Sequence, residues 1–128
     1  MPLQFTKHYT RDEARALLPD IRIWIAQLTE SREKLNAYEE KMAEPLAAGA
    51  DLGGDLVDRW VRLLADTRDV LDEFQTRQIE IKDLDRGLVD FPAFVGGKEV
   101  FLCWEKDEED IEYWHDLTSG YAGRERIE

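Results

Sequence analysis

The segment LVDFPAFVGGKEVFLCW, residues 88–104, decides the fold class of this chain. Apolar residues alternate with other residues on both sides of Gly96 and Gly97, and this period of two is typical of β-strands. The glycine pair predicts a tight turn, so the segment is expected to form an antiparallel hairpin. A loop of these two glycines sets the opposite pairs as Val95 with Lys98, Phe91 with Leu102, Val89 with Trp104, and Asp90 with Cys103.

A third strand is predicted over residues 111–115, after a charged turn. Its register decides which face of the sheet His115 occupies. If Glu105 pairs with Ile111, His115 lies on the same face as Asp90, whereas a shift of one residue moves it to the apolar face. The sequence leaves both registers open. In the first register a small polar cluster forms from Asp90, Cys103, Tyr113 and His115.

The N-terminal half of the chain is predicted to be helical. Thr10 to Glu13 form a capping box that begins a helix near Arg11. Pro19 is expected to end this short helix after Leu18, because proline removes a backbone hydrogen bond and clashes with the preceding turn. The same proline suits the first turn of a second, long helix that ends near residues 45–48. Its heptad-spaced positions are Ile21, Leu28, Leu35 and Met42, alternating with Trp24, Ser31, Tyr38 and Pro45.

A glycine-rich loop is predicted over residues 49–54, and Asp55 is a candidate N-cap for another long helix. Helices of about 25 to 28 residues run on the order of 40 Å, so the helical hairpin is expected to project from a body of this size. Pairing with a second copy, as a homodimer with a four-helix contact, would cover its apolar stripe. That stripe, wider than a two-strand seam, consists of Leu56, Val57, Trp60, Leu63, Leu64, Val70, Leu71 and Phe74.

These elements predict an α+β fold in a single domain spanning residues 1–128. A long antiparallel helical hairpin, with a short N-terminal helix, is expected at about residues 10–80. A β region follows at about residues 81–124, with a small antiparallel sheet of about three strands.

The charge and composition of the chain limit the kinds of partner that it is expected to bind and the compartment in which it is expected. With 17 Lys and Arg against 29 Asp and Glu, the net charge is −12, and such a field repels nucleic acid and anionic membranes. No apolar run approaches the roughly 20 residues of a membrane span, and the N-terminus lacks the pattern of a secretory signal. The lone Cys103 agrees with a reducing compartment, so the protein is expected in the cytoplasm.

Carboxylates around a predicted turn are the first candidates for a functional site. Asp83, Asp85 and Asp90 flank Arg86-Gly87, and a spacing of two can aim carboxylates at one cation. Together with His115 they make a possible set of divalent-metal ligands. The alternative is that Asp83 and Asp85 hold the turn through backbone hydrogen bonds, and that His115 is a structural residue bonded to a backbone carbonyl.

A wider ligand-binding set is predicted in the same region. To Asp83, Asp85, Asp90 and His115 it adds an arginine and three aromatic residues, which suit an apolar or planar ligand. The alternative is that the aromatic rings form the core between sheet and helices. Cys103 is interpreted as a packed thiol, because free cysteines are among the most buried residues. The four added residues are Trp104, Tyr113, Trp114 and Arg124.

The motifs KDLDRGLVDFPA, EVFLCWE, YWH and GYAGR resemble a family of small uncharacterised bacterial proteins grouped as a domain of unknown function. The resemblance covers nearly the whole chain and is specific over residues 82–124. It implies a cytosolic bacterial protein, and the family carries no settled activity or cofactor. It also implies a characteristic set of residues, namely Asp83, Asp85, Asp90, Trp104, Trp114, His115 and Arg124.

The sequence therefore supports two functions. The first is a non-enzymatic, homodimeric interaction or small-ligand-binding protein, because an amphipathic hairpin is present without a recognisable catalytic unit. The alternative is a protein that binds a divalent metal such as Mn, Fe or Zn, or a metal-dependent enzyme, through the carboxylates and the one histidine.

Overall fold

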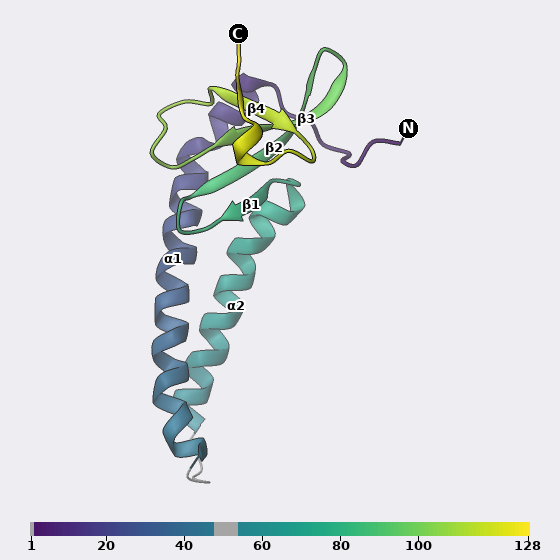
Figure 1. The fold of residues 1–128 in the computed structure, drawn as a ribbon. Coiled ribbons are helices and arrows are strands. Elements are labelled where there is room, and N and C mark those ends of the chain that lie inside the picture. The colour runs from purple at the N-terminus through teal and green to yellow at the C-terminus, as the bar shows by residue number, and fades with distance from the viewer. Residues whose placement is uncertain (1, 48–53) are drawn as a thin grey trace.

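The computed structural model describes residues 2–47 and 54–128, and it shows an antiparallel pair of long helices joined to an antiparallel sheet (Figure 1). The predicted α+β fold with a helical hairpin is confirmed. The sheet lies at the end of the hairpin where both chain termini are found, and the helices extend away from it. The elements are α1 (Arg11–Ala47), α2 (Gly54–Thr76), β1 (Glu80–Asp83), β2 (Leu88–Val95), β3 (Lys98–Trp104), β4 (Tyr113–Asp116), a 3-10 turn η1 (Tyr121–Gly123) and β5 (Glu125–Arg126).

Helix α1 begins as its capping box predicts. The Glu13 amide donates to Thr10 Oγ1 at 3.1 Å, and the Thr10 amide donates to Glu13 Oε1 at 3.0 Å. These two hydrogen bonds stabilise the carboxylate and lower the pKa of Glu13. The helix ends at Ala47, inside the predicted window.

Helix α1 is continuous through Pro19, so the predicted short N-terminal helix is wrong. Pro19 lies on the exposed side of the helix, where water can bond the Arg15 carbonyl that loses its usual donor. Leu18 and Ile21, on either side of the proline, are 4% and 0% exposed and belong to the same core. Packing of one apolar stripe therefore holds the two turns in line despite the missing hydrogen bond.

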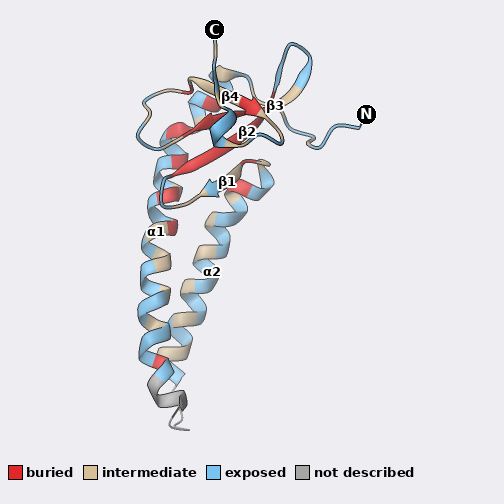
Figure 2. Cartoon of the chain, viewed as in Figure 1, coloured by how far each residue is buried: buried red, intermediate tan, exposed pale blue. Residues whose placement is uncertain are grey.

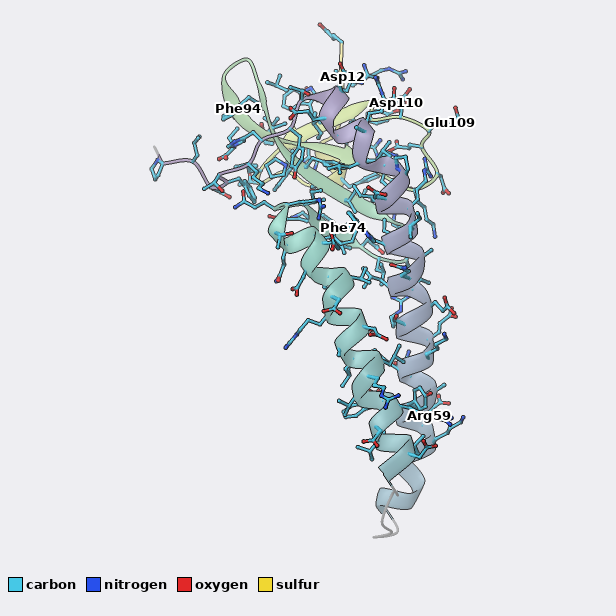
Figure 3. The ribbon with its side chains drawn as sticks, turned by 180° about the vertical axis from the view of Figure 1, so that it is seen from behind. Asp12, Arg59, Phe74, Phe94, Glu109 and Asp110 are labelled. Carbon is cyan, nitrogen blue, oxygen red and sulfur yellow. The ribbon has the colours of Figure 1, made fainter. Side chains whose placement is uncertain are left out.

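Helix α2 starts at Gly54, so Asp55 lies inside its first turn and not before it. The rest of the predicted glycine-rich loop lies outside the described residues. Phe74, near the C-terminal end of α2, is buried at the junction of the hairpin and the sheet (Figure 3). Its ring packs edge-on against Trp24 of α1 at 5.5 Å between ring centroids. None of the helices in the described ranges has the length and apolar character that a membrane span requires.

The sheet has five strands in the order β1-β2-β3-β4-β5, where the sequence predicted about three. The central hairpin has the predicted register, with Asp90 opposite Cys103 and Phe91 opposite Leu102. The two edge strands were missed because they are short: β1 has four residues and β5 has two. Segments of that length show no measurable alternation and form because a neighbouring strand offers them hydrogen bonds.

The two faces of the sheet are covered by different parts of the chain. Helix α1 packs on the face of Val89 and Leu102, and the buried residues concentrate there (Figure 2). The opposite face is covered by shorter segments. The ring of Phe5 meets that of Phe101 edge-on at 5.4 Å between centroids, and Lys82 Nζ lies 5.0 Å from the centroid of the same ring. This second face carries the polar residues of interest.

Candidate functional site

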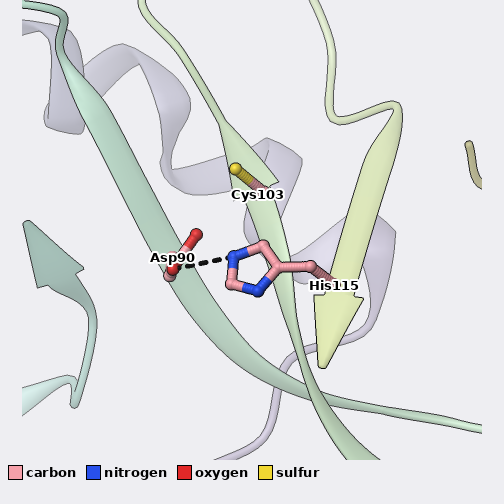
Figure 4. Close-up of side chains that lie close together, drawn as sticks. All are labelled: Asp90, Cys103 and His115. Carbon is pink, nitrogen blue, oxygen red and sulfur yellow. Dashed lines mark hydrogen bonds and ion pairs between the residues drawn. The ribbon is translucent and has the colours of Figure 1, made fainter. Parts of the chain in front are cut away.

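A polar cluster of Asp90, Cys103 and His115 lies on the sheet face away from α1. The three residues come from β2, β3 and β4, and successive side chains of a strand point to opposite faces. Because β4 pairs His115 with Phe101, the register that places His115 on the Asp90 side is the one that forms. One ligand-type atom from each of the three residues lies within 4.8 Å of the others (Figure 4).

The cluster is closed to solvent, since Asp90, Cys103 and His115 are 1%, 0% and 1% exposed. A charged or polar group at such depth costs free energy unless it is paired. His115 Nε2 lies 3.0 Å from Asp90 Oδ2, and this is the main interaction inside the cluster. Asp90 Oδ1 is also buried and has no hydrogen-bond partner among the described residues.

The contacts of His115 fix where its protons are. Its Nδ1 lies 2.7 Å from the backbone carbonyl of Asp116, and a carbonyl only accepts, so Nδ1 carries a hydrogen and donates it. If Nε2 carried no hydrogen, its lone pair would face the carboxylate of Asp90 and be repelled by it. The pair therefore holds one further proton between Nε2 and Oδ2.

Burial also sets the protonation of the other two side chains. Removal from water raises the pKa of Asp90, and the nearby His115 opposes that rise. The pKa of the Cys103 thiol is raised strongly, first by burial and then by the Asp90 carboxylate beside it. Without a bound cation, Cys103 is therefore a neutral thiol.

Thiol catalysis does not fit this arrangement. A catalytic cysteine needs a histidine nitrogen free to take its proton, and an ionised thiol at working pH. Both ring nitrogens of His115 are already engaged, one by Asp90 and one by the Asp116 carbonyl. The interpretation of Cys103 as a packed thiol agrees with its full burial.

Residues of the C-terminal segment pack on the same side of the sheet as the cluster, over Tyr113 beside Cys103. The Arg124 guanidinium lies 3.8 Å from the ring centroid of Tyr113 and 4.5 Å from that of Tyr121. It donates from Nη2 to Glu108, while its buried Nη1 has no hydrogen-bond partner within the described part of the chain. Arg86 lies 4.1 Å from the centroid on the same Tyr121 ring. Alternating cations and aromatic rings thus hold this segment over the sheet.

The remaining predicted site residues lie elsewhere. Asp83 Oδ1 accepts the Arg86 amide at 3.2 Å, and Asp85 pairs with Arg32 of α1. These contacts are those of a turn and a surface ion pair, and neither carboxylate belongs to the buried cluster of potential metal ligands. The structure brings together Asp90 and His115 of the predicted metal set, without Asp83 and Asp85.

The predicted aromatic residues divide between the two faces. Trp104 is fully buried on the α1 side, where its Nε1–H donates to the Glu108 carbonyl at 2.9 Å. Trp114 packs against the same core. Tyr113 lies beside Cys103 on the cluster side, under Arg124. The aromatic residues therefore do not line one common pocket.

The sequence interpretation missed Cys103 as a potential ligand, although the predicted hairpin already placed it opposite Asp90. The signal was the register of the hairpin and not any motif. Three hollows on the surface are lined by other residues, around Trp114, Arg22 and His8. The cluster is thus a closed centre, and it is not the floor of one of these hollows.

The fold and the cluster define a small α+β protein with a buried Asp–Cys–His centre between three strands of one sheet. The chain belongs to the family described as "Uncharacterized conserved protein (DUF2203)", whose profile spans residues 7–127. This membership confirms the resemblance to an uncharacterised family. No curated protein and no solved structure matches the chain.

Proposed function

We propose that the protein binds a transition-metal ion, with Zn²⁺ as the best fit, through Asp90, Cys103 and His115. The observation that carries the proposal is the meeting of three fully buried ligand-type side chains within 4.8 Å. Asp90 Oδ1, which is buried and has no hydrogen-bond partner among the residues that the structure describes, adds to this support, because native proteins rarely leave such an atom unpaired.

The donor set suits zinc in both charge and chemistry. Thiolate, imidazole and carboxylate are the three ligand types that zinc takes in proteins. An ionised Cys103 and an ionised Asp90 together neutralise a divalent cation, and a neutral centre is the least costly one to bury. The hydrogen bond from His115 Nδ1 to the Asp116 carbonyl is also the usual support for a metal-binding imidazole.

The spacing of His115 and Asp90 needs little adjustment, and the Cys103 sulfur lies within 4.8 Å of both ligand atoms. Two ligand atoms on a tetrahedral zinc, each about 2.0 to 2.1 Å from the ion, lie roughly 3.3 Å apart. His115 Nε2 and Asp90 Oδ2 are 3.0 Å apart. A cation in this position replaces the proton that the pair holds, and it removes the repulsion between the lone pair and the carboxylate.

Burial favours a role in metal binding over catalysis on an incoming substrate. The three ligands are at most 1% exposed, and Tyr113, which lies beside Cys103 in the sheet, is itself covered by Arg124. We place the protein in the cytoplasm, where reducing conditions keep a thiol ligand available. Self-association through the helical hairpin, which the sequence also predicted as part of an interaction or small-ligand-binding role, uses a different surface and does not compete with this site.

The test is zinc content of untagged protein after dialysis against zinc and then buffer, measured by elemental mass spectrometry. About one zinc per chain is expected in the native protein, and far less in Cys103→Ala and His115→Gln. His8→Gln is the matched control, because His8 is the other histidine of the chain and also pairs with a carboxylate, Glu99, at 2.7 Å. Cobalt substitution adds a second readout, since a thiolate ligand gives an intense charge-transfer absorption.

Asp90→Asn separates metal binding from a purely structural role. The asparagine amide can donate to His115 Nε2, so the fold keeps this hydrogen bond and loses a buried charge. Zinc binding is expected to fall while the thermal midpoint of the metal-free protein stays the same or rises. Native protein without zinc, or zinc retained equally by Asp90→Asn and Cys103→Ala, would exclude the proposed site.

A further inference from the structure

Helix α2 carries two apolar rows side by side, and both follow the alternating spacing of four and three residues that is typical of helix contacts. The inner row ends in Val70 and Phe74, which pack on the core with α1. The outer row is offset from it by about a quarter of the helix circumference. The inner row is Leu56, Trp60, Leu63, Thr67, Val70 and Phe74, and the outer row is Val57, Val61, Leu64, Arg68 and Leu71.

The two rows differ in exposure. Val61, Leu64 and Leu71 of the outer row are 50%, 40% and 42% exposed. The outer face of α1 is different, since Ile23 is its one large apolar residue exposed within the described part of that helix. Within its described residues the hairpin therefore offers one uncovered apolar row, and this row lies on α2.

We propose that this outer row is the contact of a two-fold homodimer, in which α2 of one copy lies antiparallel to α2 of the other. A two-fold contact uses the same surface twice, so a single straight row is sufficient. Because the row that faces α1 lies about a quarter turn from the outer row, α1 of each copy lies beside the α2 pair. One face of each hairpin then meets the other, and the four helices form a bundle.

The area of such a contact is adequate for a stable dimer. Helix α2 has 23 residues, which corresponds to about 35 Å at 1.5 Å per residue. Two helices side by side are roughly 20 Å wide, so one hairpin face offers on the order of 700 Å². A typical stable interface buries about 800 Å² on each partner.

The charges along the row also fit a second copy. Arg68 is exposed within the outer row, and Asp58 and Asp72 lie along the flank of that row away from α1. In an antiparallel two-fold pair the same flank of each helix faces the other copy, so these carboxylates lie on the side where the other Arg68 emerges. The same symmetry also brings Asp58 and Asp72 of both copies onto one flank. The two Arg68 side chains offset part of that like charge, in a chain whose net charge of −12 otherwise opposes self-association.

The far half of the hairpin lacks a core of its own. Beyond Leu28, Met42 is the one buried residue among the described side chains of α1. In Figure 2 this part of both helices is coloured mostly as exposed or intermediate, whereas the buried residues gather near the sheet. In the proposed dimer, the hairpin of the second copy buries side chains in this part of the first.

Sedimentation velocity and light scattering across a wide dilution range test the proposal. The native protein is expected to be a dimer, and Leu64→Glu is expected to weaken the dimer roughly 100-fold or more, because it buries an unpaired charge at the contact. Leu64 is already exposed within one chain, so circular dichroism should show an unchanged fold. Val61→Glu provides a second variant in the same row.

Ile23→Glu is the matched control, since Ile23 is 56% exposed on the opposite side of the hairpin, and it should leave the dimer intact. Repeating each measurement with zinc and with a chelator separates this inference from the metal site, and the dimer should persist in both. A native protein that is monomeric at every concentration would overturn the inference. So would a Leu64→Glu variant that dimerises like the native chain.

Discussion

Zinc binding by this protein should release two protons per ion, and this count can be derived from the contacts of the cluster. One proton is that of the Cys103 thiol, whose pKa burial raises. The other is the proton that His115 Nε2 and Asp90 Oδ2 hold between them at 3.0 Å. Both must leave before the three side chains can act as ligands. For each proton that is released on binding, the zinc affinity rises tenfold per unit of pH.

The affinity should therefore rise about 100-fold for each unit of pH, or roughly 2.7 kcal/mol. The direction follows from mass action, because a higher pH favours the deprotonated ligands that bind the ion. Competition against a chromophoric chelator at several pH values between about 6 and 8, where a free thiol is still mostly protonated, measures the slope. Calorimetry in two buffers with different enthalpies of protonation counts the released protons directly.

Two variants sharpen the measurement. Cys103→Ser should reduce the slope to one, because a serine hydroxyl has no proton to lose in this range. His8→Gln, outside the cluster, should keep a slope of two. A native slope near zero would refute the assignment of both protons, and a native slope of one would show that either the thiol or the His115–Asp90 pair releases no proton when zinc binds.

Three further predictions concern the fold. Pro19→Ala should raise the free energy of unfolding by about 2 kcal/mol, since it restores the hydrogen bond to the Arg15 carbonyl inside a continuous helix; a loss of stability in urea unfolding would instead favour two separate helices. Gly87→Ala should cost about 1 to 2 kcal/mol in the same assay, because Gly87 has a φ of +63° and an added Cβ would lie 2.6 Å from Cβ of Lys106. Glu99 accepts two backbone amides of the N-terminal segment, which lowers its pKa, so its contribution to stability is present above its usual pKa and is lost as the pH falls through the lowered value. Glu99→Gln should accordingly flatten the acid side of the thermal midpoint against pH, and an unchanged acid profile would contradict this role.

Patterns within short stretches of sequence predicted the parts of the fold that depend on residues close together in the chain. The capping box at Thr10 closes between residues of one turn, and the Gly96-Gly97 turn aligns the two strands that it joins. In both cases the hydrogen bonds that define the structure lie within the pattern itself, so reading the pattern is enough. The predicted pairing of Asp90 with Cys103 was correct for this reason.

Tertiary packing decided the features that depend on distant partners. Pro19 stays inside α1 because Leu18 and Ile21 pack on a sheet formed some 70 residues later in the chain. The edge strands β1 and β5 exist because a neighbouring strand offers them hydrogen bonds. Neither requirement is visible in the segment itself.

The candidate site combines both kinds of information. The sequence by itself placed Asp90 and Cys103 on one face of a hairpin. It left open whether His115 lies on the same face or on the opposite one. Only the pairing of β4 with β3 decided the outcome, because a slip of one residue turns every side chain of a strand to the other face. That register depends on which side chains of β4 the core and the covering C-terminal segment can bury, and this is a property of the folded molecule and not of the strand.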